Sequence, residues 1–179
     1  MDKIIFFDND DQREDHCVGE IYYNFLDYAF EKTDFFMLVY VNYYGKGYTK
    51  TMKSFRDELK PYKVKSRTNP SWPGTLWTIC PNTTYKVVFY RNCAEAKEIL
   101  KRVNCLSAWS CPSYPQDLAF FKGNQCWAYS VGHETMGAII HADEEDLDFV
   151  ERLGLAKRED AEDHRDNYFD SYDEDLLDI

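Results

Sequence analysis

The chain has 179 residues, of which 17% are aromatic, and a formal net charge of −11 at neutral pH. That length suits one domain of ordinary size, and the aromatic side chains can fill a substantial core. No window approaches the roughly 20 apolar residues of a membrane-spanning helix, and the start turns acidic after four apolar residues, which excludes an ordinary signal peptide. The sequence therefore predicts a cytoplasmic protein without membrane attachment.

The six cysteines contain no CxxC pair, and most fall inside or beside apolar runs. A chain without an export signal is expected to keep its thiols reduced. We therefore expect free, buried thiols rather than disulfides.

The first third of the chain predicts two strands and two helices. Residues 3–7 form a short apolar run typical of a strand. Between residues 18 and 30 the apolar side chains recur at i, i+3, i+4 and i+7, which places them on one helical face. Residues 35–41 are continuously apolar and rich in β-formers, so we expect a strand buried on both faces in the middle of a sheet. A narrow apolar stripe over residues 48–59 predicts a second helix, which ends before Pro61.

The next segment is more irregular. Residues 63–66 predict an edge strand, and residues 75–80 and 85–91 alternate well enough to predict a hairpin. Asn92, followed three positions later by Glu95, matches a capping box and predicts a third helix.

The stretch from Asp117 to residue 146 gives the clearest pattern. Apolar runs over residues 118–121, 126–131 and 136–142 are separated by turn residues and predict a three-strand meander. Asp143 then caps a helix that Gly154 ends.

These elements predict an α+β fold: a mixed, mainly antiparallel sheet of about six to eight strands with three or four helices packed on it. We expect a single domain over residues 1–155. Residues 156–179 are expected to form an acidic C-terminal tail, either disordered or used for docking.

Charge is distributed unevenly along the chain. Residues 46–102 carry 13 basic and 4 acidic side chains, whereas residues 143–179 carry 4 basic and 16 acidic ones. A segment this acidic can be a solvated end, or it can dock on a basic protein. It can also lie across the basic stretch of its own chain or of a second copy, which would give a homodimer.

The tail also contains large apolar residues, which a solubilising tail does not need. We therefore predict binding through its rings and neighbouring carboxylates. The predicted binding residues are Tyr168, Phe169, Asp170, Tyr172, Asp173, Glu174 and Asp175, together with Trp72 of the proline-rich loop.

One cluster suggests acid–base chemistry. Asp117, His133, Glu134 and His141 fall within the meander, and a neighbouring imidazole and carboxylate can move a proton. The spacing matches no standard zinc motif, because HExxH would need His at position 137 and the chain has glycine there. We expect no metal and no cofactor, and a loop His–Glu pair is more often solvated.

Basic and aromatic residues alternate between residues 46 and 102, as they do on nucleic-acid-binding surfaces. The aromatic residues, however, fall on the expected core face, no known nucleic-acid motif is present, and the net charge repels a polyanion. The sequence therefore argues against direct nucleic-acid binding.

Three segments, KVKSRTNPSWPGT, TTYKVVFYR and DLAFFKGNQCWAYSVGHE, resemble passages in small uncharacterised proteins of bacteria and their phages. The resemblance spans roughly residues 60–142 and carries over no catalytic residue. Proteins of this size and acidity resemble immunity proteins and phage counter-defence inhibitors, which plug a basic site on another protein.

The favoured hypothesis is a non-enzymatic protein that inhibits or sequesters a basic protein partner through acidic and aromatic surface. The alternative is a small enzyme or ligand-binding domain with a pocket around Asp117, His133, Glu134 and His141.

Overall fold

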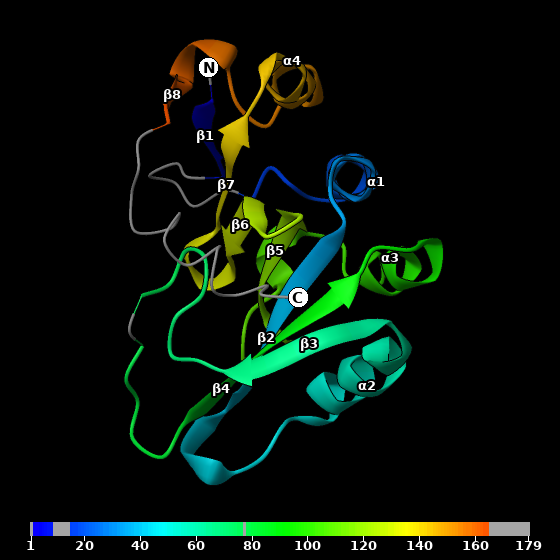
Figure 1. Ribbon diagram of the computed structural model, residues 1–179, viewed down its shortest axis with the longest axis vertical. Coiled ribbons are helices and arrows are strands. Elements are labelled where there is room, and N and C mark those ends of the chain that lie inside the picture. The colour runs from blue at the N-terminus through cyan, green and yellow to red at the C-terminus, as the bar shows by residue number, and fades with distance from the viewer. Residues whose placement is uncertain (1, 9–14, 77, 165–179) are drawn as a thin grey trace.

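The structure, a computed structural model, describes residues 2–8, 15–76 and 78–164 and shows a twisted sheet with helices against one face (Figure 1). The strands are β1 (Lys3–Phe7), β2 (Phe35–Asn42), β3 (Lys63–Thr68), β4 (Thr84–Arg91), β5 (Gln116–Lys122), β6 (Gln125–Val131), β7 (Met136–Ala142) and β8 (Glu162–Asp163). The α-helices are α1 (Glu20–Lys32), α2 (Lys50–Leu59), α3 (Ala94–Leu100) and α4 (Glu144–Leu153). Short 3₁₀ turns are η1 (Tyr43–Gly45), η2 (Lys60–Tyr62), η3 (Leu106–Ala108), η4 (Gly132–Glu134) and η5 (Arg158–Asp160).

The eight strands follow the order β3-β4-β2-β5-β6-β7-β1-β8, and the pairs that join them are antiparallel. The predicted α+β class and the sheet with helices packed on it are therefore confirmed. β2 lies next to the centre and β3 at one edge, as predicted. The meander is formed by β5, β6 and β7.

Strand β2 shows why a continuous apolar run marks a central strand. Phe36, Leu38 and Tyr40 point into a core shared with the helices, whereas Met37 and Val39 belong to a second cluster on the opposite face. Successive side chains in a strand alternate between faces, so a strand that is covered on both sides needs apolar residues at every position.

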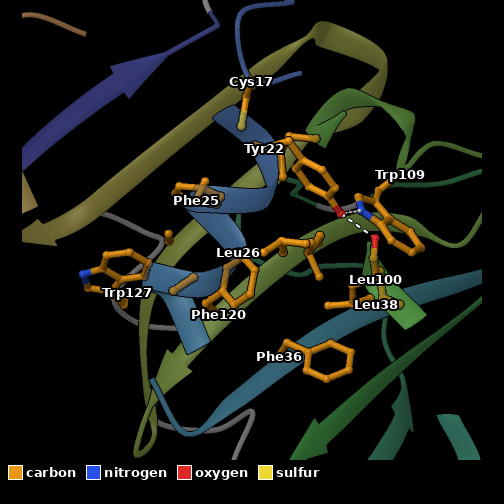
Figure 2. Packing of buried hydrophobic residues seen from close by; sticks show 14 of the residues in the cluster. Cys17, Tyr22, Phe25, Leu26, Phe36, Leu38, Leu100, Trp109, Phe120 and Trp127 are labelled. Atoms are coloured by element: carbon orange, nitrogen blue, oxygen red, sulfur yellow. Dashed lines mark hydrogen bonds between the residues drawn. The ribbon is translucent and has the colours of Figure 1, made fainter. Parts of the chain in front are cut away.

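The helix-side core is centred on α1 and rich in aromatic rings (Figure 2). Two buried polar groups are satisfied within it: Trp109 Nε1 donates to the Tyr22 hydroxyl at 2.9 Å, and that hydroxyl donates to the Leu100 carbonyl at 2.9 Å. Buried Trp and Tyr usually need such partners. This chain of bonds joins α1 to the end of α3 and to the loop before β5.

Among the described residues, no helix contributes to the cluster on the opposite face of the sheet. That face is covered in part by the loop after β3, in which Trp72 lies 5.3 Å from the Tyr85 ring, centroid to centroid. Gly74 packs directly on β6: a Cβ there would lie 2.7 Å from the Tyr129 ring. The loop therefore needs glycine at this close approach.

The predicted hairpin of residues 75–80 and 85–91 is wrong. β4 pairs along one edge with β2 and along the other with β3, so no edge of β4 is left for residues 75–80. The loop instead closes on itself, with backbone bonds in both directions between Trp72 and Thr75.

The predicted capping box at Asn92 is also wrong. The N-cap of α3 is Cys93, and it makes no side-chain capping bond. The Asn92 amide donates to the Thr33 carbonyl at 3.0 Å. A capping box does occur at α4, between Asp143, which the sequence predicted as the cap, and Asp146.

The structured chain continues beyond residue 155. β8 pairs with β1, and the His164 amide donates to the Asp2 carbonyl at 3.0 Å. Residues 156–164 of the expected tail are therefore connected to the domain. The predicted binding residues Tyr168, Phe169, Asp170, Tyr172, Asp173, Glu174 and Asp175 lie outside the described residues.

A buried side chain, that of Asp8, holds the segment that leads into α1. Asp8 is 4% exposed, and its oxygens accept the amides of His16 at 2.7 Å and Cys17 at 2.9 Å. Burial, and then the hydrogen-bonded side chain of Asp15, raise the pKa of Asp8 to about 7. The folded protein therefore holds a proton here at pH values where the unfolded chain has lost it.

This shift gives a pH prediction. Because the pKa of Asp8 is raised by folding, its contribution to stability falls as pH rises between about 4 and 7. We expect Asp8→Asn, which keeps an acceptor oxygen, to reduce this fall of stability with rising pH. At the upper end of the pH range, the variant should have a higher urea midpoint than wild type. Asp27→Asn is the control: burial opposes the charge on Asp27, but Lys97 and Lys101 lower its pKa, so its contribution is instead lost in acid. Parallel pH profiles of wild type and Asp8→Asn would contradict this account.

Candidate functional site

Of the four residues predicted for acid–base chemistry, all of which the structure describes, Asp117 alone is fully buried, and it holds several segments together. Its Oδ2 accepts from Trp72 Nε1 at 2.8 Å, from Gln116 Nε2 at 3.2 Å and from Thr75 Oγ1 at 3.3 Å. Its Oδ1 accepts from the Gly132 amide at 3.0 Å. The carboxylate therefore connects the loop after β3, the start of β5 and η4.

The surroundings of Asp117 indicate a structural role. Burial raises the pKa of its carboxyl, although the hydrogen bonds from Trp72 and Gly132 oppose the rise. Asp117 also has a positive φ of 57°, which aspartate tolerates better than most residues. Gly132 must be glycine, since a Cβ there would lie 2.2 Å from the Trp109 carbonyl oxygen. The carboxylate that the sequence suggested for acid–base chemistry is thus already hydrogen-bonded to donors of the protein.

His133 and Glu134 lie in η4 next to Asp117, but on the surface. Their side chains are 57% and 59% exposed, with Nε2 and Oε1 3.7 Å apart. They border a cleft of about 520 Å³, which is also lined by Tyr43, Tyr85, Ser110, Cys111 and Gln116. Burial raises the pKa of the Cys111 thiol to about 11, so it is protonated at neutral pH and is not an activated nucleophile.

His141 is not part of this cleft. It lies on β7, with Nδ1 3.4 Å from both Gln125 Nε2 and Asp2 Oδ2, and its ring is 4.3 Å from that of His164. Six residues of strand correspond to roughly 20 Å, which places His141 far from η4. The predicted group of four is therefore not assembled. Within residues 2–8, 15–76 and 78–164, no group of three His, Cys, Asp or Glu side chains could hold a metal ion.

Trp72 was predicted as a surface binding residue, and this is wrong. Its side chain is 0% exposed, because its indole packs on Tyr85 and its Nε1 donates to Asp117. Tyr85 and Tyr90, in the same basic stretch, are buried as well. These rings serve the core rather than stacking on bases.

Comparisons with known protein families, curated proteins and solved structures find no match to this chain. Function must therefore be argued from the residues themselves. All six cysteines are free, with Cys17 and Cys126 buried. Among the described helices, none combines the length and apolar character needed to cross a bilayer.

The two ends of the sheet differ in charge. β3 and α2, at one end, carry Lys63, Lys65 and Arg67 and, on the helix, Lys50, Lys53 and Arg56. α4 and β8, at the other end, belong to a described segment, residues 143–164, with 10 acidic and 3 basic side chains. Figure 1 shows these two groups at opposite ends of the long axis. The two charged segments are visible in the sequence, but their separation in space is a property of the fold.

Part of the acidic end is neutralised within the domain, and part is open. Lys32 pairs with Asp143 and Glu145, and Arg158 pairs with Glu144 and Asp148. Three further carboxylates are exposed and form no ion pair within the described part of the chain: Glu159, Asp160 and Glu162. They flank the point from which the chain continues into residues 165–179.

Proposed function

We propose that this protein is a non-enzymatic binding protein that inhibits or sequesters a basic protein partner. The observation that supports it is the exposed acidic end formed by α4, η5 and β8, which is continuous in sequence with the acidic and aromatic residues 165–179. Carboxylates on one end of a molecule whose other end is basic create a directional field, which orients a cationic partner during its approach.

The two kinds of residue would act differently in such a complex. The carboxylates of η5, β8 and the following residues would raise the association rate, because long-range attraction acts before contact. Tyr168, Phe169 and Tyr172 would supply contact area, since buried aromatic rings dominate the binding energy of most interfaces. Together they describe a surface suited to lysine- and arginine-rich protein.

The chemistry around Asp117 also favours binding over catalysis, because its carboxylate is held by protein donors and Cys111 carries its proton. The resemblance to immunity and counter-defence proteins suggests the biological setting, in which the partner would be a nuclease toxin or a nucleic-acid-handling defence complex. Six free thiols fit the reducing cytoplasm.

The first test identifies a partner by affinity capture from host cells and phage-infected cells, followed by calorimetry with the purified protein. We expect deletion of residues 165–179 to weaken binding by about tenfold or more and to flatten its salt dependence. The deletion must begin at residue 165, because removing residues from Glu159 onward would also remove β8. Unchanged affinity would contradict the proposed binding surface.

Two matched variants then separate rings from charges. Replacing Tyr168, Phe169 and Tyr172 by alanine keeps every carboxylate, whereas neutralising Asp170, Asp173, Glu174 and Asp175 to the amides keeps every ring. We expect the ring variant to lose affinity mainly through faster dissociation and the amide variant mainly through slower association. Stopped-flow kinetics measures both rates. Identical kinetic defects would contradict the division of roles.

A second candidate function is small-molecule binding in the cleft beside η4. The supporting observation is its volume of about 520 Å³ with polar groups from Gln116, His133 and Glu134 beside the rings of Tyr43 and Tyr85. A ligand screen by protein NMR would test it: shifts confined to these residues would favour a ligand-binding domain.

The separated charges also bear on self-association. The acidic end of one copy can face the basic end of another, which is a head-to-tail contact. Sedimentation at low and high salt would reveal it, because screening shortens the range of exposed charge contacts from about 10 Å at 0.1 M to about 3 Å at 1 M.

A further inference from the structure

The basic end of the molecule contains a cavity of about 310 Å³ between α2 and the sheet. Its floor is formed by β2 and β4, and its rim by α2, η2 and the start of β3. The residues around it are Tyr40, Tyr48, Arg56, Asp57, Lys60, Lys63, Lys86, Val88 and Tyr90. We call it the basic pocket. It is separate from the cleft beside η4, with which it shares no lining residue.

The charges in the basic pocket are unbalanced. Arg56 is paired with the neighbouring Asp57, at 3.0 Å from Nη2 to Oδ1. Lys60, Lys63 and Lys86 form no ion pair with any residue that the structure describes. Three lysines thus border one cavity, and their like charges repel each other. Such an arrangement is favourable when an anion is bound between them.

Two of the tyrosines that line the pocket are buried and share a hydrogen bond. Tyr40 and Tyr90 are each 1% exposed, and their hydroxyl oxygens are 2.7 Å apart. Burial raises the pKa of both, so both keep their protons at neutral pH. Only one of the two hydrogens can lie between the oxygens. The other hydroxyl hydrogen is not used in this bond, so it can be donated to a ligand in the cavity.

These observations indicate which ligand chemistry the pocket favours. Such a ligand must accept a hydrogen bond from a buried hydroxyl and carry more than one negative charge to balance three lysines. A carboxylate carries one charge, whereas a phosphate monoester carries close to two at neutral pH and offers three acceptor oxygens. We propose that the basic pocket binds the phosphate group of a small phosphorylated molecule.

The rest of such a ligand would meet aromatic and aliphatic surface. The Tyr48 ring lies 6.1 Å from that of Tyr40, centroid to centroid, and the Arg56 guanidinium carbon lies 5.7 Å from the Tyr48 centroid. Val88 adds an apolar side chain. The volume is at the lower end of the range of ligand sites, which suits a sugar phosphate or a molecule of similar size rather than a polymer.

Calorimetry on the full chain tests the proposal with three probes of similar carbon skeleton: glucose 6-phosphate, gluconate and glucose. We expect glucose 6-phosphate to bind at one site at least about tenfold more tightly than gluconate, because hydrogen bonds from charged groups to phosphate are strong. Glucose should not bind measurably. Affinity should rise as pH increases through about 6, where the phosphate monoester loses its second proton. Equal binding of the phosphate and the carboxylate would overturn the proposal.

Variants locate the site. Lys63→Gln and Lys86→Gln should each weaken glucose 6-phosphate binding by about tenfold. Lys53→Gln, which removes the same charge from an exposed position of α2 outside the pocket, should change it less than about twofold. Equal losses of affinity in all three variants would show a diffuse charge effect and would contradict binding in the basic pocket.

The hydroxyl pair provides a second readout. Tyr90→Phe leaves one hydroxyl, that of Tyr40, whereas the double variant Tyr40→Phe with Tyr90→Phe leaves none. We expect the double variant to lose about tenfold in phosphate affinity relative to the single one. Circular dichroism confirms that each variant is folded before titration. A double variant that is folded and binds as tightly as wild type would exclude the hydroxyls from the site.

Discussion

Replacing Asp117 by alanine should lower the free energy of unfolding by about 3–5 kcal/mol, because the buried donors that it satisfies would be left without partners. The Trp72 indole, the Gly132 amide and the Gln116 amide all point at this carboxylate. Each buried donor that loses its acceptor costs roughly 1–3 kcal/mol. The loss is increased by the cavity that remains in place of the carboxyl group.

Urea unfolding at neutral pH measures this effect. Asp148→Ala is the control, because Asp148 is also a carboxylate but is exposed and held by an ion pair, and exposed pairs contribute about 0–1 kcal/mol. Asp117→Asn should fall between alanine and wild type. Asparagine keeps one acceptor oxygen and tolerates a positive φ, but its amide nitrogen would face a donor. A loss below about 1 kcal/mol for Asp117→Ala would contradict the structural role and reopen a catalytic one.

The elements that the sequence predicted best are those whose pattern is local. β1 and β7 have the bounds expected from their apolar runs, and α4 begins after Asp143 and ends at Gly154 as predicted. Helical periodicity, strand alternation and caps depend on residues a few positions apart, so they can be read from one sequence. The apolar pattern of residues 35–41 even indicated a central strand.

Strand pairing was harder to predict from the sequence. Residues 75–80 and 85–91 have the pattern of a hairpin, yet β4 pairs instead with β2, which is more than 40 residues distant in the chain. Alternation shows which face of a strand is buried but not which strand lies beside it. The partner is decided by the packing of the whole sheet.

The predicted acid–base group around Asp117 is not assembled, for a related reason. Asp117 looked reactive because it is acidic and lies in the meander with His133, but its donors Trp72 and Thr75 come from 45 and 42 residues away. The hydroxyl pair of the basic pocket joins residues 50 apart. A polar residue that is satisfied by distant partners and one that is free for chemistry look the same in sequence.

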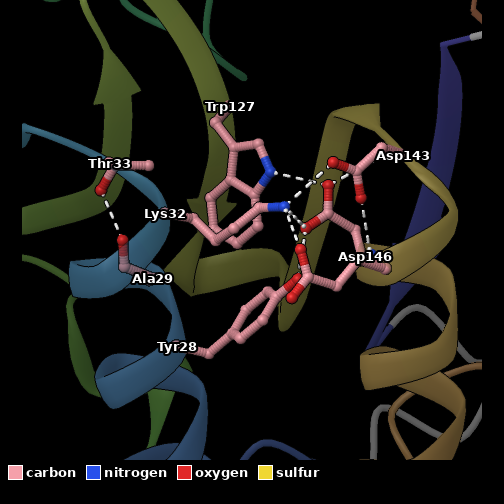
Figure 3. A network of polar contacts seen from close by, with 8 residues as sticks. Tyr28, Ala29, Lys32, Thr33, Trp127, Asp143 and Asp146 are labelled. Atoms are coloured by element: carbon pink, nitrogen blue, oxygen red, sulfur yellow. Dashed lines mark hydrogen bonds and ion pairs between the residues drawn. The ribbon is translucent and has the colours of Figure 1, made fainter.

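A further buried carboxylate, that of Asp146, joins three elements on the helix side of the sheet, and its loss should be as damaging as that of Asp117 (Figure 3). Asp146 is 1% exposed. Its Oδ1 accepts from the Tyr28 hydroxyl at 2.7 Å, and its Oδ2 accepts from Trp127 Nε1 at 3.2 Å and from the Asp143 amide at 3.0 Å. Lys32 Nζ lies 3.3 Å from Oδ1. The carboxylate thereby connects α1, β6 and the start of α4.

The positive charge of Lys32 offsets the cost of burying the Asp146 carboxylate. Burial opposes the ammonium group, but the carboxylates of Asp143, Glu145 and Asp146 outweigh it and raise the pKa of Lys32 above its ordinary value. Two surface carboxylates and one buried carboxylate therefore share one cation. Removal of Asp146 leaves Lys32 with two partners, whereas removal of Lys32 leaves a buried negative charge held only by neutral donors.

We therefore expect Asp146→Ala to cost about 3–4 kcal/mol of unfolding free energy, since it removes the acceptor for Tyr28 and Trp127 and half of the capping box. Asp143→Ala, which removes the other half, should cost only about 1 kcal/mol, because its amide keeps Asp146 as acceptor and its side chain is exposed. A double-mutant cycle of Asp146→Ala with Lys32→Met should give a coupling of about 1 kcal/mol or more. Equal costs for Asp143→Ala and Asp146→Ala in urea unfolding would mean that the cap matters and the buried bonds do not. The larger loss at Asp146 would show that the contacts between α1, β6 and α4 depend on one carboxylate.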